Sequence, residues 1–335
     1  MKVKDLGEFG VIDLLNRMVV QGRTGPDHSA PFNFHLLVDT GDDTAAWRTG
    51  EATELFTTDT AVEGVHFTRQ TTPWRDLGWK SLVSNISDIA AMGGQPAYAL
   101  VTLGLPPDTE VEDLQQLYQG MLEAGNEYGV AIVGGDMVRS PVVFITVALT
   151  GVMAGRPLLR STARPGDQVA VTGYMGSSGG GLKLMQEGIG ASSEATEHLC
   201  QAHRRPEPAV AAGSILARSG VLTAMDISDG LADDLAKLCL ASQVSARIFG
   251  DQVPVHPLLK DTFPREYLHL ALNGGEDYQL LFAAPVEVME QVLPKLTEGA
   301  GVIGEIAAGT PGQVTIVDAG GRETAAGRAG WDHFG

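Results

Sequence analysis

Short runs of apolar and β-branched residues alternate with longer helical stretches along most of this 335-residue chain. Residues 76–92 and 108–128 are expected to form helices, the second of them capped by Asp108 and Thr109. Residues 98–105 and 142–152 are typical of strands. Strands that alternate with helices in this way predict an α/β or α+β fold.

The first half of the chain contains further elements that the sequence predicts. Residues 8–20 have the apolar spacing of an amphipathic helix, and residues 34–38 and 55–58 are expected to be strands, with a turn-like segment over 44–54 between them. Residues 130–133 are expected to form a short buried strand that ends before Gly134-Gly135-Asp136. The composition changes at 154–157, which predicts one domain over residues 1–153 and another over 154–335.

Acidic residues beside Gly, Ser or Thr recur through the sequence. Asp59 is expected at the end of the strand 55–58, with His66 seven residues later, and strand ends in α/β folds open into crevices. Taken singly, each acid also suits a helix cap or a turn. Together they predict a shared site for Mg²⁺ and phosphate, formed by Asp43, Asp59, Asp88, Asp136, Asp226 and Asp229.

Other candidate phosphate contacts have alternative roles that the sequence leaves open. No stretch matches the Walker A pattern, and the Gly-rich loop 173–181 suits a phosphate cradle or a plain turn before a helix about equally. Arg160, Arg164 and the Arg204-Arg205 pair suit phosphate binding or the surface. Ile86-Ser87-Asp88 resembles Ile227-Ser228-Asp229, which makes an internal duplication plausible.

The charge and the cysteines exclude some classes of function. The chain has 41 acidic and 23 basic residues, for a net charge of −18, which argues against nucleic-acid binding. Only Cys200 and Cys239 are present, without metal-type spacing, so a disulfide framework or structural zinc is not expected. Without a signal peptide or a long apolar run, we expect a soluble cytoplasmic protein.

Nine stretches, taken together and in order, resemble the thiamine-monophosphate kinase family. EGVHF, GGEDY and the WDHF ending distinguish this family from related ATP-dependent enzymes. The stretches are spread in order over almost the whole chain and are GEFGVIDLL, GDDTA, TTDTAVEGVHF, NISDIAAMGGQP, IVGGD, RSTARPGD, MDISDGLADDL, NGGEDYQLLF and WDHF. The resemblance implies the two-domain fold of the aminoimidazole ribonucleotide synthetase-like superfamily, whose N-terminal domain pairs with its twin to close a barrel in a homodimer.

The resemblance also implies an activity, transfer of the γ-phosphoryl group of ATP to thiamine monophosphate, and the residues that support it. It implies Mg²⁺ ligands at Asp43, Thr57, Thr58, Asp59, Asp88, Asp136, Asp226 and Asp229. It implies ATP contacts at Gly135, Asp136, Arg160 and Ser228, and substrate contacts at His66, Glu276 and Trp331. Asp59, Asp136 and Arg160 are expected to position metal and phosphate, and a phosphate oxygen acceptor requires no general base.

Two alternatives are consistent with the acidic stretches. Other ATP-dependent enzymes of the superfamily, such as selenophosphate synthetases and hydrogenase-maturation dehydratases, use a reactive cysteine near one end of the chain, where this sequence has none. A non-catalytic acidic module that binds divalent cations would leave the Gly-rich turns and GGEDY unexplained.

Overall fold

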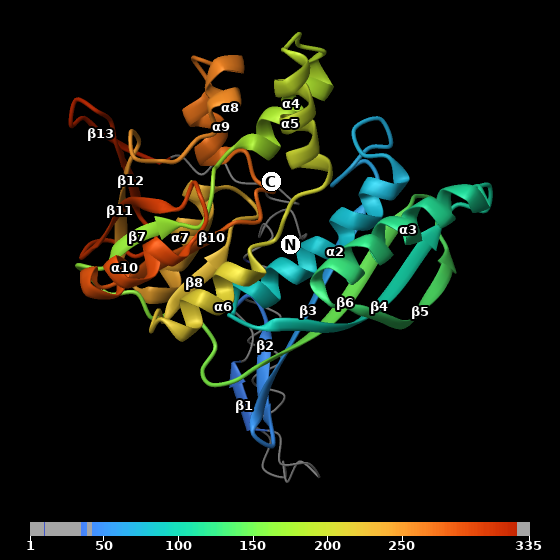
Figure 1. Cartoon of the computed structure of the whole chain (residues 1–335), viewed down its shortest axis with the longest axis horizontal. Helices are drawn as coiled ribbons and strands as arrows, with labels where there is room; N and C mark the ends of the chain where they lie inside the picture. Colours follow the sequence, from blue (N-terminus) through green and yellow to red (C-terminus); the bar gives the residue numbers. More distant parts are fainter. Residues whose placement is uncertain (1–9, 11–34, 39–41, 327–335) are drawn as a thin grey trace.

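The computed structural model describes Gly10 and residues 35–38 and 42–326, and they form two sheets with helices packed around them (Figure 1). The predicted helix 8–20 and Trp331 therefore lie outside the described residues, apart from Gly10. No helix in these ranges is long and apolar enough to cross a membrane.

The first sheet is built from the N-terminal half of the chain. Its strands are β1 (His35–Val38), β2 (Ala45–Thr49), β3 (Ala52–Val62), β4 (Gln95–Leu105), β5 (Ala131–Arg139) and β6 (Phe144–Met153). They lie in the order β1-β2-β3-β6-β4-β5, and only β4 and β5 are parallel neighbours. The helices α2 (Trp74–Ala91) and α3 (Val111–Tyr128) pack against each other on one face of this sheet.

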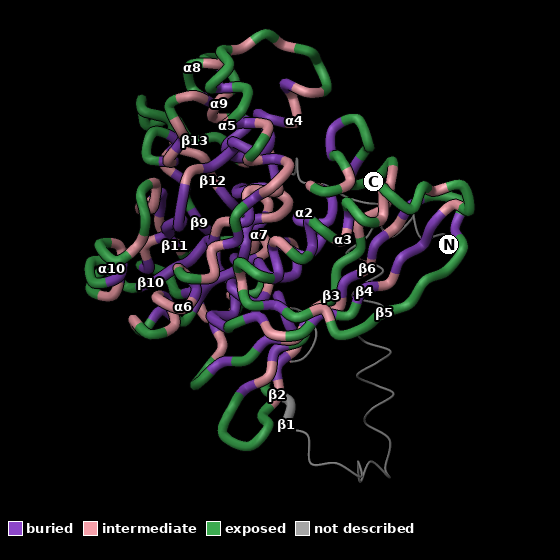
Figure 2. Tube along the Cα trace, turned by 45° about the vertical axis from the view of Figure 1, so that its right-hand side comes forward, coloured by how far each residue is buried: buried purple, intermediate pink, exposed green. Residues whose placement is uncertain are grey.

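The other face of the first sheet has no helix over it within the described residues. Side chains alternate between the two faces of a strand, so Leu55 and Ala99 point into the core while Phe56, Tyr98 and Leu100 point away from it. Figure 2 shows that β5, at the edge of this sheet, is exposed along almost its whole length. A broad, partly apolar sheet face is therefore open in the single chain.

The second sheet is built from the C-terminal half and has helices on both faces. Its strands lie in the order β13-β12-β9-β11-β7-β10-β8. Their bounds are β7 (Gln168–Val171), β8 (Thr223–Asp226), β9 (Ser245–Phe249), β10 (Leu280–Ala284), β11 (Gly301–Ala307), β12 (Val314–Val317) and β13 (Glu323–Ala325). The helices of this half are α4 (Ser177–Glu187), α5 (Ser193–Arg204), α6 (Val210–Arg218), α7 (Leu231–Ser242), α8 (Pro257–Thr262), α9 (Tyr267–Asn273) and α10 (Val286–Val292), followed by the 3₁₀ turn η1 (Leu293–Lys295).

The helix α2 connects the two halves. Its residues Leu82, Ile86 and Ile89 belong to the core beneath the first sheet. At its C-terminal end, Ala91 belongs instead to a core that contains Leu216 of α6 and Phe282 of β10. Thus α2 packs on the first sheet along its length and on elements of the second half at its end (Figure 1).

Several sequence predictions about these elements are wrong in detail. Residues 44–54 are not turn-like, because β2 and β3 form an antiparallel hairpin there, with Ala46 fully buried. Asp59 does not follow a strand but lies within β3, where it pairs with Val147 of β6. Similarly, β5 is longer and more exposed than predicted and includes Gly134-Gly135-Asp136, and α3 begins after Glu110 rather than at a cap formed by Asp108 and Thr109. In each case, pairing with another strand or packing in the folded chain gives the element other bounds than those that the local sequence predicts.

Candidate active site

A cleft of about 510 Å³ lies between α2, β3 and the loops that follow β8 and α9. Most of its walls are polar or charged. It is lined by Thr58, Asp59, Thr60, Ala61, Val62, His66, Phe67, Leu77, Lys80, Ser81, Ser84, Asp88, Arg160, Asp226, Ser228, Asp229, Glu276 and Tyr278. Many of the predicted site residues are thus brought together from both halves of the chain.

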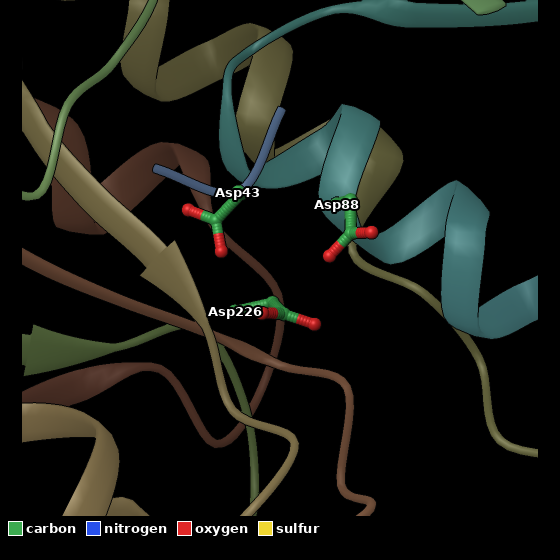
Figure 3. A group of neighbouring side chains, drawn as sticks. All are labelled: Asp43, Asp88 and Asp226. Carbon is green, nitrogen blue, oxygen red and sulfur yellow. The ribbon is translucent and has the colours of Figure 1, made fainter. Parts of the chain in front are cut away.

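Three carboxylates gather at one end of this cleft. Asp43 precedes β2, Asp88 lies on α2, and Asp226 ends β8, and one oxygen of each lies within 4.8 Å of the other two. Figure 3 shows the three side chains around a shared space. Carboxylate oxygens converging from separate elements are the ligand set that Mg²⁺ prefers.

The electrostatics of this acidic cluster (Asp43, Asp88 and Asp226) favour a bound cation. Burial, followed by the charges of Asp59, Asp226 and Asp43, raises the pKa of Asp88 well above its usual value. Burial and the charge of Asp43 likewise raise the pKa of Asp226, although Ser87 Oγ donates a hydrogen bond of 2.8 Å to its Oδ2. When ionised, these buried carboxylates repel one another, and a divalent cation would relieve the repulsion.

Arg160 is the main cation beside the cluster and is already engaged by acids. Its Nη2 donates to Asp43 Oδ1 at 2.5 Å, and its backbone N–H donates to Asp42 Oδ2 at 3.1 Å. Burial alone would lower the pKa of Arg160, but Asp43 and Asp42 raise it above its usual value. Burial and Asp43 also raise the pKa of Asp42 to about 7. Arg160 thus fixes the segment 42–43 beside the second half of the chain.

The β3 residues predicted to bind metal divide between the two faces of the first sheet. Thr57 Oγ1 donates a hydrogen bond of 2.5 Å to Asp88 Oδ2, which places Thr57 at the acidic cluster. Asp59 shares that face and lines the cleft, and burial of its carboxyl together with nearby Asp229 raises its pKa, although a hydrogen bond from Ser84 opposes the shift. Thr58 also lines the cleft, but it belongs to the other face of the sheet, and its Oγ1 donates to the carbonyl oxygen of Val147.

The loop after β8 is held by a buried carboxylate that sequence reasoning missed. Asp234 Oδ2 accepts hydrogen bonds from the backbone N–H groups of Ser228, Asp229 and Gly230 at 3.0 to 3.1 Å. Lys237 forms ion pairs with both Asp229 and Asp234. The spacing in Ile227-Ser-Asp-Gly-Leu-Ala-Asp-Asp234 was a usable signal, because an acid in the first turn of a helix commonly bonds the preceding backbone.

At the other end of the cleft, Glu276 is held by cationic and polar side chains. Lys80 Nζ lies 2.8 Å from Glu276 Oε1, and His203 Nδ1 lies 3.5 Å from Oε2. Burial alone would raise the pKa of Glu276, but Lys80 and His203 outweigh it and lower the pKa. Glu276 and Tyr278 both have positive φ, of 55° and 50°, a backbone state that non-glycine residues rarely adopt. Lys80 and His203 were not among the predicted site residues.

The remaining predicted residues have different positions. His66 lines the cleft and accepts a hydrogen bond through Nδ1 from the backbone N–H of Val62. Asp136 is exposed on β5, and its Oδ1 accepts from the N–H of Met137. Beside it, a Cβ on Gly135 would come within 1.9 Å of the Val101 carbonyl oxygen, so β4 and β5 approach each other too closely there for any other residue.

The pairing of the strands sets how far Asp136 is from β3. It aligns with Thr102 of β4, Thr146 of β6 and Thr60 of β3. Three strand spacings of about 4.8 Å separate Asp136 from β3 by roughly 14 Å. Within the described part of one chain, Gly135 and Asp136 are therefore not brought into the cleft.

Comparison with known proteins reveals extended similarity. The family models of the AIR synthase related protein match in two parts, the N-terminal domain over residues 41–153 and the C-terminal domain over residues 164–317. The chain is 35% identical to the thiamine-monophosphate kinase of Synechococcus elongatus over 91% of this chain and 90% of that protein. It is 38% identical to that of Bacillus subtilis over 73% of this chain and 78% of that protein.

A solved structure is similar over nearly the full length. AaThiL complexed with AMPPCP and TMP superposes with a TM-score of 0.85 at 33% identity, covering 99% of each chain. The similarity includes both sheets and the elements that line the cleft, since the matched region spans almost all of both proteins.

Proposed function

Because the chain belongs to the thiamine-monophosphate kinase family, we propose that it transfers the γ-phosphoryl group of ATP to thiamine monophosphate, giving thiamine diphosphate and ADP. The observation that carries this proposal is the cleft itself. It has an acidic cluster (Asp43, Asp88 and Asp226) at one end and Lys80 with Glu276 at the other. An arrangement of this kind suits a reaction that joins two phosphate-bearing molecules.

We propose that Mg²⁺ is the cation held by the acidic cluster, with Thr57 and Asp59 beside it. The repulsion between the buried carboxyls of Asp88 and Asp226 and neighbouring acids supports a divalent cation, and the oxygen ligands suit Mg²⁺. When bound, Mg²⁺ would neutralise charge on the phosphates of ATP. Arg160 and Ser228 would contact the nucleotide on the same side, and His66, Glu276 and Trp331 would contact the acceptor.

We also propose that transfer is direct and in line, without a phosphorylated enzyme. A phosphate oxygen of thiamine monophosphate is already a nucleophile at neutral pH, so the protein needs only to align it. Incubation with γ-labelled ATP alone should leave the protein unlabelled after denaturation. Recovery of a stoichiometric phosphoprotein that passes its label to thiamine monophosphate would contradict direct transfer.

The open face of the first sheet supports a homodimer. Phe56, Tyr98, Leu100, Val138 and Val152 are 40 to 59% exposed, and the strand pairings place them on that face. We propose that a second copy covers them, as the family resemblance implies. Asp136 shares this face, so a partner copy would bring it near the other chain.

We further propose that the domain division lies between residues 153 and 154, which separates the two sheets. We also propose a cytoplasmic location, in keeping with the free thiols Cys200 and Cys239.

An assay of ADP release tests the main proposal. With ATP and Mg²⁺ present, ADP should appear only when thiamine monophosphate is added. A cysteine-dependent enzyme of the superfamily would not respond to thiamine monophosphate, and neither cysteine lines the cleft. A non-catalytic cation-binding module would bind Mg²⁺ or Ca²⁺ without releasing ADP.

A further inference from the structure

We propose that Lys80 and Ser81, neighbours on α2, bind the phosphate group of the acceptor, and that Glu276 positions Lys80 for this contact. The inference rests on the proposed function and adds a binding residue pair that neither the sequence nor the family resemblance assigned. In this inference Glu276 has a different role, because its carboxylate pairs with Lys80 of the same chain rather than with the acceptor.

Ser81 provides the first observation. Ser81 is 6% exposed and lines the cleft. Its Oγ is buried and has no hydrogen-bond partner among the described residues. Its neighbours differ, since Ser84 Oγ donates to the Ser81 carbonyl oxygen and Ser87 Oγ donates to Asp226. A buried hydroxyl without a partner is costly, and one that lines a cleft is satisfied when a ligand oxygen accepts from it.

The surroundings of Lys80 provide the second observation. Lys80 is 7% exposed, and its Nζ lies 2.8 Å from Glu276 Oε1 and 3.4 Å from His203 Nε2. His203 is in turn within 3.2 Å of Ser178 Oγ through Nδ1, so the group is fixed from several sides. A lysine ammonium carries three N–H donors, and these two neighbours use two of them. The third is available to a ligand in the cleft.

The distribution of charge indicates an anionic ligand for Lys80. The side chains that line the cleft include the acids Asp59, Asp88, Asp226, Asp229 and Glu276. A phosphate monoester entering this cleft needs cations near it, and among the described lining residues these are Arg160, Lys80 and His66 when protonated. Arg160 is held by Asp42 and Asp43 at the acidic cluster, which leaves Lys80 as the permanent cation at the opposite end.

The geometry of α2 places these residues at a useful separation. Lys80 and Ser81 precede Asp88 by eight and seven residues on one helix, and all three line the cleft. At about 1.5 Å per residue, Lys80 and Asp88 are roughly 12 Å apart along the helix axis. One rigid element therefore carries both the Mg²⁺-side carboxylate and the acceptor-side cation, which suits alignment of two phosphate groups.

The test compares thiamine monophosphate with thiamine, which lacks the phosphate group. The dissociation constants of both are measured by calorimetry in the presence of Mg²⁺ and a non-hydrolysable ATP analogue, for the wild type, Ser81→Ala and Lys80→Met. We expect the wild type to prefer thiamine monophosphate. Loss of a hydrogen bond to a charged group should weaken its binding about tenfold or more in Lys80→Met and several-fold in Ser81→Ala, with thiamine binding unchanged.

Control variants separate a phosphate contact from a disturbed fold. Lys183→Met removes a lysine that is paired with Glu187 on α4 and lies outside this cleft, so it should behave as wild type. Because Lys80→Met leaves Glu276 without its cation, the double variant Lys80→Met/Glu276→Gln keeps the charge balanced and should show the same loss of preference.

The outcomes distinguish this inference from the proposed function. If the wild type phosphorylates thiamine monophosphate but Lys80→Met, the double variant and Ser81→Ala keep the full preference for it over thiamine, only the inference is wrong. Equal weakening of thiamine and thiamine monophosphate would also contradict it, because the residues would then support the pocket rather than the phosphate. Absence of turnover in a wild type that still prefers the phosphorylated ligand through Lys80 would contradict the proposed function alone.

Discussion

At the scale of single residues, Asp226 is the most informative position in the acidic cluster. Asp226→Asn removes one charge and keeps an oxygen that accepts from Ser87 Oγ. We expect the variant without Mg²⁺ to melt at the same temperature as the wild type or higher, because like charges no longer repel. Its kcat should fall about 100-fold or more, since a Mg²⁺ ligand is lost. Thermal melting and steady-state kinetics measure the two effects.

The exposed Asp251→Asn variant is the matched control for this substitution. It should retain both the kcat and the melting temperature of the wild type. A metal-free Asp226→Asn protein that is markedly less stable, or that keeps full activity, would show that Asp226 has a structural role instead.

The raised pKa values of Asp88 and Asp226 predict how pH affects Mg²⁺ binding. A carboxyl whose pKa is raised by folding stabilises the metal-free protein at low pH, and that contribution is lost as the pH rises through the folded-state pKa. Mg²⁺ must displace the same protons. The rise in melting temperature caused by Mg²⁺ should therefore become larger as the pH rises through the range in which the two carboxyls lose their protons. A shift that is independent of pH in this range, or larger at the lower pH, would contradict proton competition.

The residues that the sequence predicted, and those it missed, differ in a physical way. Acids in repeated Gly, Ser and Thr contexts could be found, and Asp43, Asp88 and Asp226 do meet. Asp234 was missed although its partners Ser228, Asp229 and Gly230 are local in the sequence. Lys80 could not be found in this way, because its role depends on a partner that only folding brings near. The partner of Lys80, Glu276, is almost two hundred residues away along the chain.

At the scale of elements, α2 carries much of the cleft, and its fit against α6 is tight. A Cβ on Gly213 of α6 would lie 2.1 Å from the Ala90 carbonyl oxygen of α2. Gly213→Ala should therefore force the two helices apart and lower the free energy of unfolding by about 1–3 kcal/mol. Denaturant unfolding measures this change, and kcat should fall too because α2 positions Asp88.

Gly190→Ala is the control for the helix contact, because no atom lies within 4 Å of its added Cβ. It should leave stability within about 0.5 kcal/mol of the wild type. If Gly213→Ala were equally neutral, the close approach of α2 and α6 would not be needed for stability.

Helices and strands with a strong apolar pattern in their own sequence could be predicted, and strands that depend on pairing with a neighbouring strand could not. The predicted helix 76–92 corresponds to α2, and the predicted strand 98–105 lies within β4. By contrast, β2 was missed and β5 was predicted too short, because β2 depends on its hairpin with β3 and β5 on its parallel pairing with β4. Local propensity says little about either contact.

At the scale of the whole molecule, the open sheet face predicts the oligomeric state. Leu100 is 49% exposed on that face, in the middle of β4, so Leu100→Glu would bury a charge if a second copy covers it. We expect the wild type to sediment as a dimer and Leu100→Glu as a monomer or a much weaker dimer. Leu122→Glu, which changes a residue 53% exposed on α3, should remain dimeric. A wild type that is monomeric at micromolar concentrations would contradict the proposed homodimer.

The architecture as a whole was more predictable than its assembly. Alternating strands and helices predicted the α/β class, and the ordered stretches from GDDTA to GGEDY predicted the family, which the relatives confirm. The sequence could not predict how Asp136 reaches the metal or nucleotide site. Within the described residues of one chain, Asp136 lies roughly 14 Å across the sheet from β3.

The measurement that tests the account most directly is ³¹P nuclear magnetic resonance of the purified protein with ATP, Mg²⁺ and thiamine monophosphate. The account predicts that the single monoester resonance of thiamine monophosphate is replaced by the two coupled resonances of a diphosphate ester, with one ADP formed for each. Release of inorganic phosphate while the monoester resonance persists, or no reaction at all, would contradict it.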